Sequence, residues 1–276
     1  MRNAFFKFQP YLMGALIGYL VFLPPRGFLA LGPWRPVALM AFMVVALIAS
    51  TALNMFLSLP SRVPVEPLTE TDESISLDVV RLMREYREAG FELSQDPATV
   101  DIRPRSYIWP LINAQAGCRG SVFATGTIPR RVGYDISSEI EGGEGVLTSV
   151  ADPAAAVFPL CPGDFKELIP GATPRQLLEA HLRARAFLES RGLRFKTPRA
   201  GGLQERFERY AVKQKKVIKR NPLKAAVVVF WRASSKTSPY VGPLENQRGI
   251  DTLIQAARTE LGRGAVGGSY LQSPKS

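Results

Sequence analysis

A run of 23 residues without a charged side chain, residues 37–59, constrains the fold of this chain more than any other feature. Pro36 precedes the run and Pro60 follows it, and its only polar side chains are three hydroxyls and one amide. A helix rises about 1.5 Å per residue, so a helix of this length would cross the roughly 30 Å hydrocarbon core of a bilayer. The run therefore predicts a transmembrane helix, because a water-soluble helix would need a polar face.

The apolar stretch at about residues 5–23 leaves two interpretations open. Its basic start, with Arg2 and Lys7, is typical both of a signal sequence and of a first transmembrane helix. A well-placed cleavage site is lacking, because the small residues near position 30 are followed directly by a proline. We therefore expect residues 1–59 to form a two-helix transmembrane hairpin, with spans at about 5–23 and 37–59.

A hairpin of this kind would place both ends of the chain on one side of the membrane. The basic residues near the amino terminus and in the second half of the chain favour the cytoplasmic side. The sequence thus predicts an integral membrane protein whose soluble domain is cytoplasmic.

Charge divides the remaining chain into an acidic and a basic part. Residues 60–172 hold 10 basic and 17 acidic residues, whereas residues 173–276 hold 21 basic and 7 acidic residues. A basic half attracts an anionic partner. The candidates are a membrane surface, a nucleic acid and the acidic half of the same protein.

The segments after the hairpin predict an α+β architecture. Residues 60–75 are polar and proline-rich, as is typical of a linker, and residues 76–200 would form an α+β soluble domain. Residues 201–276 would form a basic amphipathic and C-terminal helical region.

The core of the soluble domain is predicted from its periodicity. Apolar and polar residues alternate over residues 132–140 and 146–150, which predicts a hairpin within a small antiparallel sheet of about four strands. Helices near residues 77–89 and 174–191 would cover this sheet. The second helix begins with the capping box of Thr173.

Residues 203–220 predict a basic amphipathic helix, with Phe207 and Ile218 on a narrow apolar side and basic residues opposite. The apolar run 225–231 after it is either a buried strand or an interfacial helix. We expect the following side chains to bind anionic lipid or another anion: Arg206, Arg209, Lys213, Lys215, Lys216, Lys219, Arg220, Lys224, Trp231 and Arg232.

Docking of this basic helix on the chain's own carboxylates is an alternative. The acidic residues Asp135, Glu139, Glu141 and Glu144 cluster on the predicted hairpin. Asp135 and Glu139 would lie about 13 Å apart along a strand, too far to share a cation directly. We therefore interpret them as a solvated strand face and turn, and keep docking on the chain's own basic helix as the alternative.

His181 is the one candidate for a catalytic general base. It lies on the apolar side of its predicted helix, near Leu177 and Ala184, which favours a structural role in which its ring is hydrogen-bonded to the sheet. Together with Cys118 and Cys161 it offers too few ligands for a zinc site of the usual kind. We expect no metal and no cofactor.

These features favour a membrane-anchored, non-catalytic interaction or scaffold domain that lies against the cytoplasmic membrane surface. Its expected partners are the lipid bilayer with its anionic headgroups and a further protein. One alternative is a membrane-bound enzyme acting on a lipid or a peptide through His181. The second is a membrane-tethered nucleic-acid binder.

Overall fold

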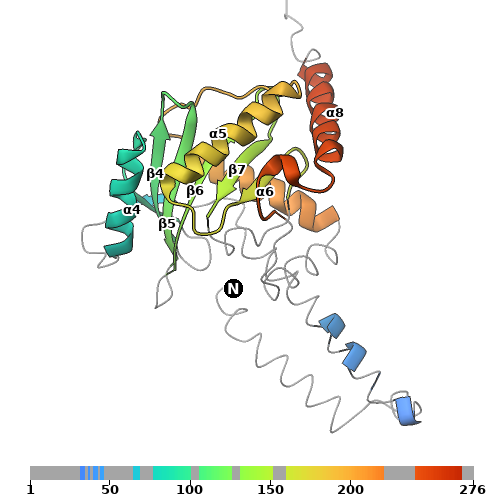
Figure 1. Cartoon of the computed structure of the whole chain (residues 1–276). Coiled ribbons are helices and arrows are strands. Elements are labelled where there is room, and N and C mark those ends of the chain that lie inside the picture. Colours follow the sequence, from blue (N-terminus) through green and yellow to red (C-terminus); the bar gives the residue numbers. More distant parts are fainter. Residues whose placement is uncertain are drawn as a thin grey trace, which may run out of the picture.

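The computed structural model describes residues 32–34, 65–68, 77–100, 106–125, 131–151, 160–220 and 240–268, together with positions 37, 40–42 and 44–46. An eight-stranded sheet lies at its centre (Figure 1). The strands are β1 (Val65–Pro67), β2 (Glu92–Leu93), β3 (Ala98–Val100), β4 (Ser106–Asn113), β5 (Cys118–Thr125), β6 (Arg131–Glu139), β7 (Val146–Val150) and β8 (Phe165–Leu168). Their order is β1-β3-β4-β5-β6-β7-β8, with β2 beside β4. Neighbouring strands are antiparallel except β7 and β8, which are parallel.

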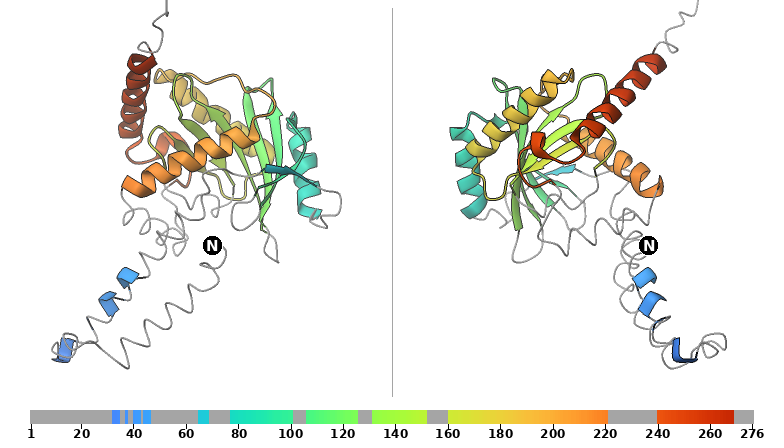
Figure 2. Two further views of the ribbon diagram at one scale, coloured as in Figure 1. Left: turned by 180° about the vertical axis from the view of Figure 1, so that it is seen from behind. Right: turned by 45° about the vertical axis from the view of Figure 1, so that its right-hand side comes forward.

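The helices of the described residues are η1 (Gly32–Trp34), α4 (Leu77–Glu88), α5 (Pro174–Ser190), α6 (Leu203–Arg220), η3 (Leu244–Asn246) and α8 (Ile250–Gly268). Three of them cover the two faces of the sheet. Helices α4 and α5 cover one face, and α6 crosses the opposite face, as the view from behind in Figure 2 shows. The domain is therefore a sheet between two helical layers.

The two faces of the sheet have separate apolar cores. On one face, Tyr86 of α4 and Leu177 of α5 are fully buried against strand residues that include Val122 and Ile136. On the other face, Ala211 of α6 packs in a smaller cluster. Because side chains alternate along a strand, β4 contributes to both cores.

Residues that come late in the chain close the outer edge of β8. The Leu168 amide donates to the Tyr240 carbonyl at 2.7 Å, and the Gly242 amide donates to the Leu168 carbonyl at 2.9 Å. Helix α8 follows η3 and packs through Ile254 in a third apolar cluster, which also contains Leu188 of α5. The sheet edge is thus completed by a segment more than 70 residues away in sequence.

Two of the predicted elements are confirmed in detail. Helix α5 begins with the predicted capping box: Thr173 Oγ1 accepts from the Gln176 amide at 3.3 Å, and Gln176 Oε1 accepts from the Thr173 amide at 3.0 Å. The predicted hairpin is formed by β6 and β7, with Glu139 opposite Val146. The capping box was therefore sufficient to predict the start of α5, and the alternation of apolar and polar residues was sufficient to predict the β6–β7 hairpin.

The predicted sheet requires correction. It is a mixed sheet of eight strands and not a small antiparallel sheet of about four, although the α+β class is correct. Strand β1 lies within residues 60–75, which the sequence predicted to be a linker. Strand β8 has only four residues, too few to establish a period of two by themselves.

The predicted transmembrane hairpin also requires correction. Among the residues that the structure describes, no helix combines the length and the apolar character needed to cross a bilayer. The prediction of an integral membrane protein is therefore wrong by this finding. Most of the two predicted spans, at about 5–23 and 37–59, lies outside the described residues, and so does the run 225–231.

Candidate functional site

His181, the predicted candidate for a general base, lies at the interface of α5 with the sheet and has no solvent exposure. Its Nε2 lies 2.8 Å from Ser138 Oγ of β6, and its Nδ1 lies 2.9 Å from Ser149 Oγ of β7. Ser149 Oγ donates in turn to Glu167 Oε1 of β8 at 2.6 Å. We call these four side chains, all buried, the buried polar network.

The carboxylate of Glu167 orients the hydrogen bonds of this network. An ionised carboxylate only accepts, so the Ser149 hydroxyl proton points to Glu167 and the Ser149 oxygen accepts from Nδ1–H of His181. The Nε2 of His181 is then the acceptor for the Ser138 hydroxyl. The second Glu167 oxygen accepts from the Leu244 amide at 3.3 Å. Each side chain of the network therefore has a partner.

Burial determines the protonation of this network. It lowers the pKa of His181 to about 3, so the imidazole is neutral near pH 7. It also raises the pKa of Glu167, which hydrogen bonds from Ser149 and Leu244 counteract. A general base must reach its substrate, whereas the His181 ring is closed off from solvent. The expected burial and hydrogen bonding to the sheet are confirmed, and this geometry gives no support to catalysis by His181.

Both cysteines are free thiols inside the protein. Burial raises the pKa of Cys118 and of Cys161 to about 12, so neither is a thiolate near neutral pH. Within the described residues, no group of three or more His, Cys, Asp or Glu side chains could hold a metal ion.

Helix α6 differs from its predicted wheel, because part of its basic side faces the protein. Lys213 Nζ lies 2.6 Å from Asp164 Oδ1 and donates to the Glu144 carbonyl at 2.8 Å. Only 11% of the Lys213 side chain is exposed, so this ion pair is nearly buried. Lys213 therefore fastens α6 to the loop before β8.

A second ion pair joins α6 to β6. Arg209 lies 3.5 Å from a carboxylate oxygen of Glu139, and Lys196 lies 3.7 Å from the other oxygen of the same carboxylate. The predicted alternative, in which carboxylates of the hairpin dock the basic helix, is realised for Glu139. Among the described residues, no ion pair joins Asp135, Glu141 or Glu144 to α6, although the Glu144 carbonyl accepts from Lys213.

The remaining basic residues of α6 lie toward its C-terminal end. We call Lys215, Lys216, Lys219 and Arg220 the basic end of α6. Lys216, Lys219 and Arg220 are exposed and Lys215 is half-buried, while Arg206 is half-buried near the start of the helix. Lys224, Trp231 and Arg232 lie outside the described residues. The structure thus divides the predicted anion-binding residues into an inward set and an outward set.

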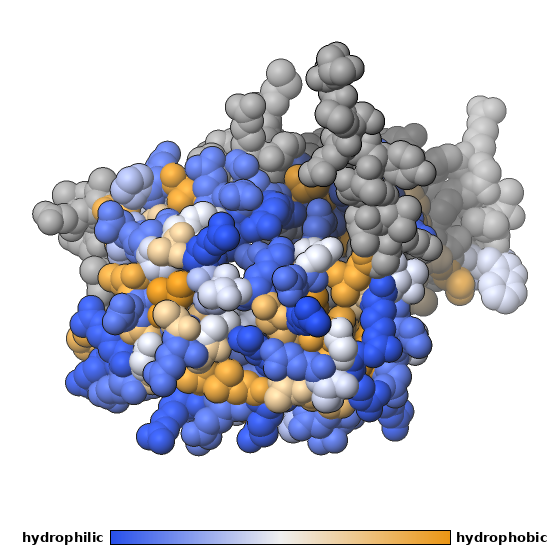
Figure 3. All heavy atoms as spheres, turned by 90° about the horizontal axis from the view of Figure 1, so that it is seen from above, coloured by the Kyte–Doolittle hydropathy of each residue, from blue (hydrophilic) through white to orange (hydrophobic). Residues whose placement is uncertain are grey.

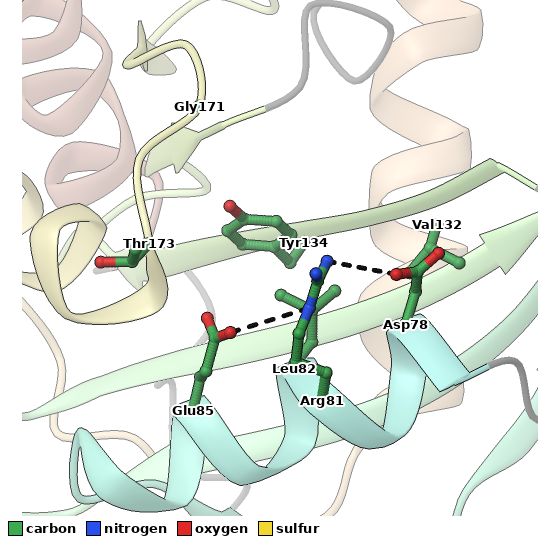
Figure 4. Close-up of a pocket in the computed structure, with 8 residues that line it drawn as sticks. All are labelled: Asp78, Arg81, Leu82, Glu85, Val132, Tyr134, Gly171 and Thr173. Carbon is green, nitrogen blue, oxygen red and sulfur yellow. Dashed lines mark ion pairs between the residues drawn. The ribbon is translucent and has the colours of Figure 1, made fainter.

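A pocket of about 390 Å³ lies between α4, the start of β6 and the loop before α5 (Figure 4). Arg81 stands between the two carboxylates of α4, at 3.2 Å from Asp78 and 3.8 Å from Glu85, and Tyr134 forms part of the wall. Each of these charged groups has an ion-pair partner within the pocket and the three sum to one negative charge, so the pocket offers no uncompensated cation for an anionic ligand.

The surface seen from above has no single dominant character. Figure 3 shows hydrophilic and hydrophobic side chains interspersed on this face, which does not by itself indicate a docking site.

No family model, curated protein or solved structure matches this chain.

The sequence did not indicate several residues that the fold brings together. Glu167 is the acidic partner in the buried polar network, although it lies 14 residues before His181 and on a strand that was not predicted. Ser138 could have been noticed, because it is a polar residue at an inward position of a strand whose other inward positions are apolar. Arg119 also went unnoticed, since the Gly201 carbonyl to which it donates lies 82 residues later, in the turn before α6.

Proposed function

We propose that this chain is a non-catalytic interaction domain that binds the surface of an acidic phospholipid layer through the basic end of α6. The observation that carries the proposal is the exposure of Lys216, Lys219 and Arg220 together on one end of one helix. No ion pair between these three side chains and a carboxylate is found among the described residues. Their charge is therefore available to an anionic partner.

The apolar side of α6 is already occupied by the protein's own sheet. Ala211 and Ile218 are buried there, so the helix cannot insert this side into lipid without leaving the domain. The proposed contact is thus electrostatic and peripheral, and it involves no transmembrane helix. Each basic side chain near an anionic surface contributes about 1 kcal/mol.

One exposed apolar side chain favours a phospholipid layer over a nucleic acid. Val212 is 44% exposed and lies one helical turn before Lys216, on the same side of α6. Apolar side chains beside lysines suit the boundary between headgroups and acyl chains. The predicted transmembrane hairpin gives no support to lipid binding, so helix α6 alone supports this contact.

The first prediction concerns the basic end of α6. Replacing Lys215, Lys216, Lys219 and Arg220 with Gln should weaken binding of the full chain to phosphatidylserine vesicles by roughly 100-fold, since the three exposed side chains alone contribute about 3 kcal/mol of attraction. Cosedimentation with vesicles measures this. Neutral phosphatidylcholine vesicles provide the baseline for any contact that does not depend on lipid charge.

A matched control removes the same charge from the other helical layer. Arg84, Arg87, Arg175 and Arg183 are exposed on α4 and α5, and their replacement with Gln should leave vesicle binding unchanged. Raising the salt from 0.1 M to 1 M should weaken wild-type binding, because the Debye length falls from about 10 Å to about 3 Å. Equal losses in both variants would contradict the proposal. So would binding to a single-stranded RNA competitor without binding to vesicles, which would favour a nucleic-acid partner.

A further inference from the structure

A second charged region lies beneath α6, on the sheet face that this helix covers. Arg119 of β5 is paired with Ser137 in the sheet register, and Asp135 two residues earlier accepts a hydrogen bond from Ser121 Oγ at 2.6 Å. Side chains along β5 alternate between the two faces of the sheet, and Phe123 packs in the same apolar cluster as the buried residues of α6. Every second residue counted from Phe123, including Arg119, therefore faces α6. Arg119 and Asp135 therefore lie between the sheet and the helix.

Two guanidinium groups converge at the start of α6. Arg119 Nη1 donates to the Gly201 carbonyl at 3.4 Å, and Arg206 Nε donates to the Gly202 carbonyl at 3.4 Å. These carbonyls are neighbours in the turn that leads into the helix. Both arginines are half-buried. One arginine from the sheet and one from the helix thus meet at a single turn.

The surrounding carboxylates leave this pair of positive charges only partly compensated. Glu139 is shared by Lys196 and Arg209, at 3.7 and 3.5 Å. Within the described residues, no carboxylate lies within ion-pair distance of Arg119 or Arg206. Burial, followed by the proximity of Arg119, lowers the pKa of Arg206 to about 10, while Glu139 and Asp135 act in the opposite direction. Two like charges are therefore held together in a half-buried place, where their repulsion is only partly screened.

We propose that Arg119 and Arg206 form a binding site for a small phosphate-bearing anion at the start of α6. The guanidinium fork matches the oxygens of a phosphate, and two forks from different elements can hold one phosphate between them. The site lies on the underside of α6, apart from the basic end, so it does not depend on the proposed lipid contact. Its ligand is inorganic phosphate or the monoester of a small metabolite.

Thermal unfolding of the full chain tests this site. Ten millimolar inorganic phosphate should raise the wild-type Tm by at least about 2 °C relative to chloride of equal ionic strength. The Arg119→Gln and Arg206→Gln variants should lose this rise. Arg87→Gln, which removes the same charge from the exposed surface of α4, should keep it. Isothermal titration with phosphate should show binding at least about tenfold weaker for both arginine variants.

The ligand-free variants supply an independent readout. Because the two arginines repel each other, Arg119→Gln should unfold in chloride at a Tm no lower than that of the wild type. Arg119→Lys, which keeps the charge but loses the fork, should bind phosphate more weakly than the wild type and serves if the Gln variant does not fold. Parallel titrations with inorganic phosphate and with glycerol 3-phosphate distinguish the two ligands. Tighter binding of phosphate indicates a site for the free anion, and tighter binding of glycerol 3-phosphate indicates a site for a monoester.

Three results would overturn the site: no phosphate effect on the wild type, an undiminished effect in the arginine variants, or a lowered Tm of Arg119→Gln in chloride. A failed vesicle experiment would leave these measurements unaffected, because the basic end is intact in every arginine variant.

Discussion

The imidazole of His181 donates through one nitrogen and accepts through the other, and this polarity is imposed by a carboxylate two hydrogen bonds away. Glu167 takes the proton of Ser149, which leaves the Ser149 oxygen free to accept from His181. Protonation of the ring at Nε2 would place two donors, Ser138 and the imidazolium, against each other unless the Ser138 hydroxyl turned. The network therefore holds His181 in one neutral tautomer.

The second prediction concerns this histidine. His181→Gln should lower the free energy of unfolding by roughly 1–2 kcal/mol at pH 7, because at least one buried hydrogen bond is lost. Urea denaturation at pH 7 measures this loss. The variant should remain folded and keep its binding to acidic vesicles, since His181 is remote from the exposed basic end.

The same variant isolates the pH dependence that His181 contributes. Its folded pKa of about 3 lies below the unfolded value of about 6.5, so between these values the unfolded state binds the extra proton. The contribution of His181 to the free energy of unfolding is therefore fully present above about pH 6.5 and decreases as the pH falls. The difference in stability between wild type and His181→Gln should shrink by up to about 2 kcal/mol between pH 6.5 and pH 5. A difference that stays constant or grows would show that the ring is not held neutral.

At the scale of the element, α6 is held to the domain by both apolar and ionic contacts. Its apolar residues pack with β3 and β4, while Lys213 reaches Asp164 in the loop before β8. Asp164 also accepts from the Val146 amide at 3.1 Å. The ion pair therefore connects the helix with the start of β7 as well.

The third prediction tests this connection. Lys213→Met should destabilise the protein by about 2–4 kcal/mol, because it leaves a buried carboxylate without its cation. Lys216→Met, one turn later and exposed, should change stability by no more than about 0.5 kcal/mol. The double variant Lys213→Met/Asp164→Asn should recover part of the loss, since no unpaired charge remains. Denaturant titrations of the wild type, of these three variants and of the single variant Asp164→Asn measure these differences. Strict additivity of the two single changes would show that the residues do not interact.

The elements differ in how much of them the sequence could predict. Helix α5 and the β6–β7 hairpin carry local signals, a capping box and a strict alternation, and both were predicted correctly. Strand β8 takes its position from its neighbours β7 and residues 240–242, and it has no periodicity long enough to be recognised. For α6 the wheel predicted a helix with one basic side, but it could not show that Lys213 would meet a carboxylate 49 residues earlier in the chain.

At the scale of the whole molecule, the sheet separates two unlike interfaces. The interface with α4 and α5 is mainly apolar and contains the buried polar network. The interface with α6 combines a smaller apolar cluster with the charges of Arg119, Asp135, Glu139 and Arg206. The candidate sites follow this division, since the pair of arginines lies only at the interface with α6. This pair could not be predicted from the sequence, because it depends on which face of the sheet α6 covers.

The fourth prediction is that local stability follows the depth of a strand in the sheet. Backbone amides of β5, which lies between β4 and β6 and beneath helices on both faces, should exchange with deuterium most slowly among the described strands. Amides of β1 and β2, short strands at the periphery, should exchange fastest. Native-state hydrogen exchange followed by mass spectrometry measures this order. Equal protection of β1 and β5 would contradict it.

The closing of β8 by residues 240–244 has a consequence for the nascent chain. Leu244, whose amide donates to the second carboxylate oxygen of Glu167, lies 77 residues after Glu167 in the chain. At about 5–20 residues per second, the ribosome needs roughly 4–15 seconds to synthesise this stretch. During that interval the outer edge of β8 has no strand beside it. An exposed edge invites pairing with another chain, and charged side chains on the strand discourage it. Lys166 and Glu167 occupy the middle of β8, so the strand carries two charged side chains of the kind that discourage such pairing until residues 240–244 are in place.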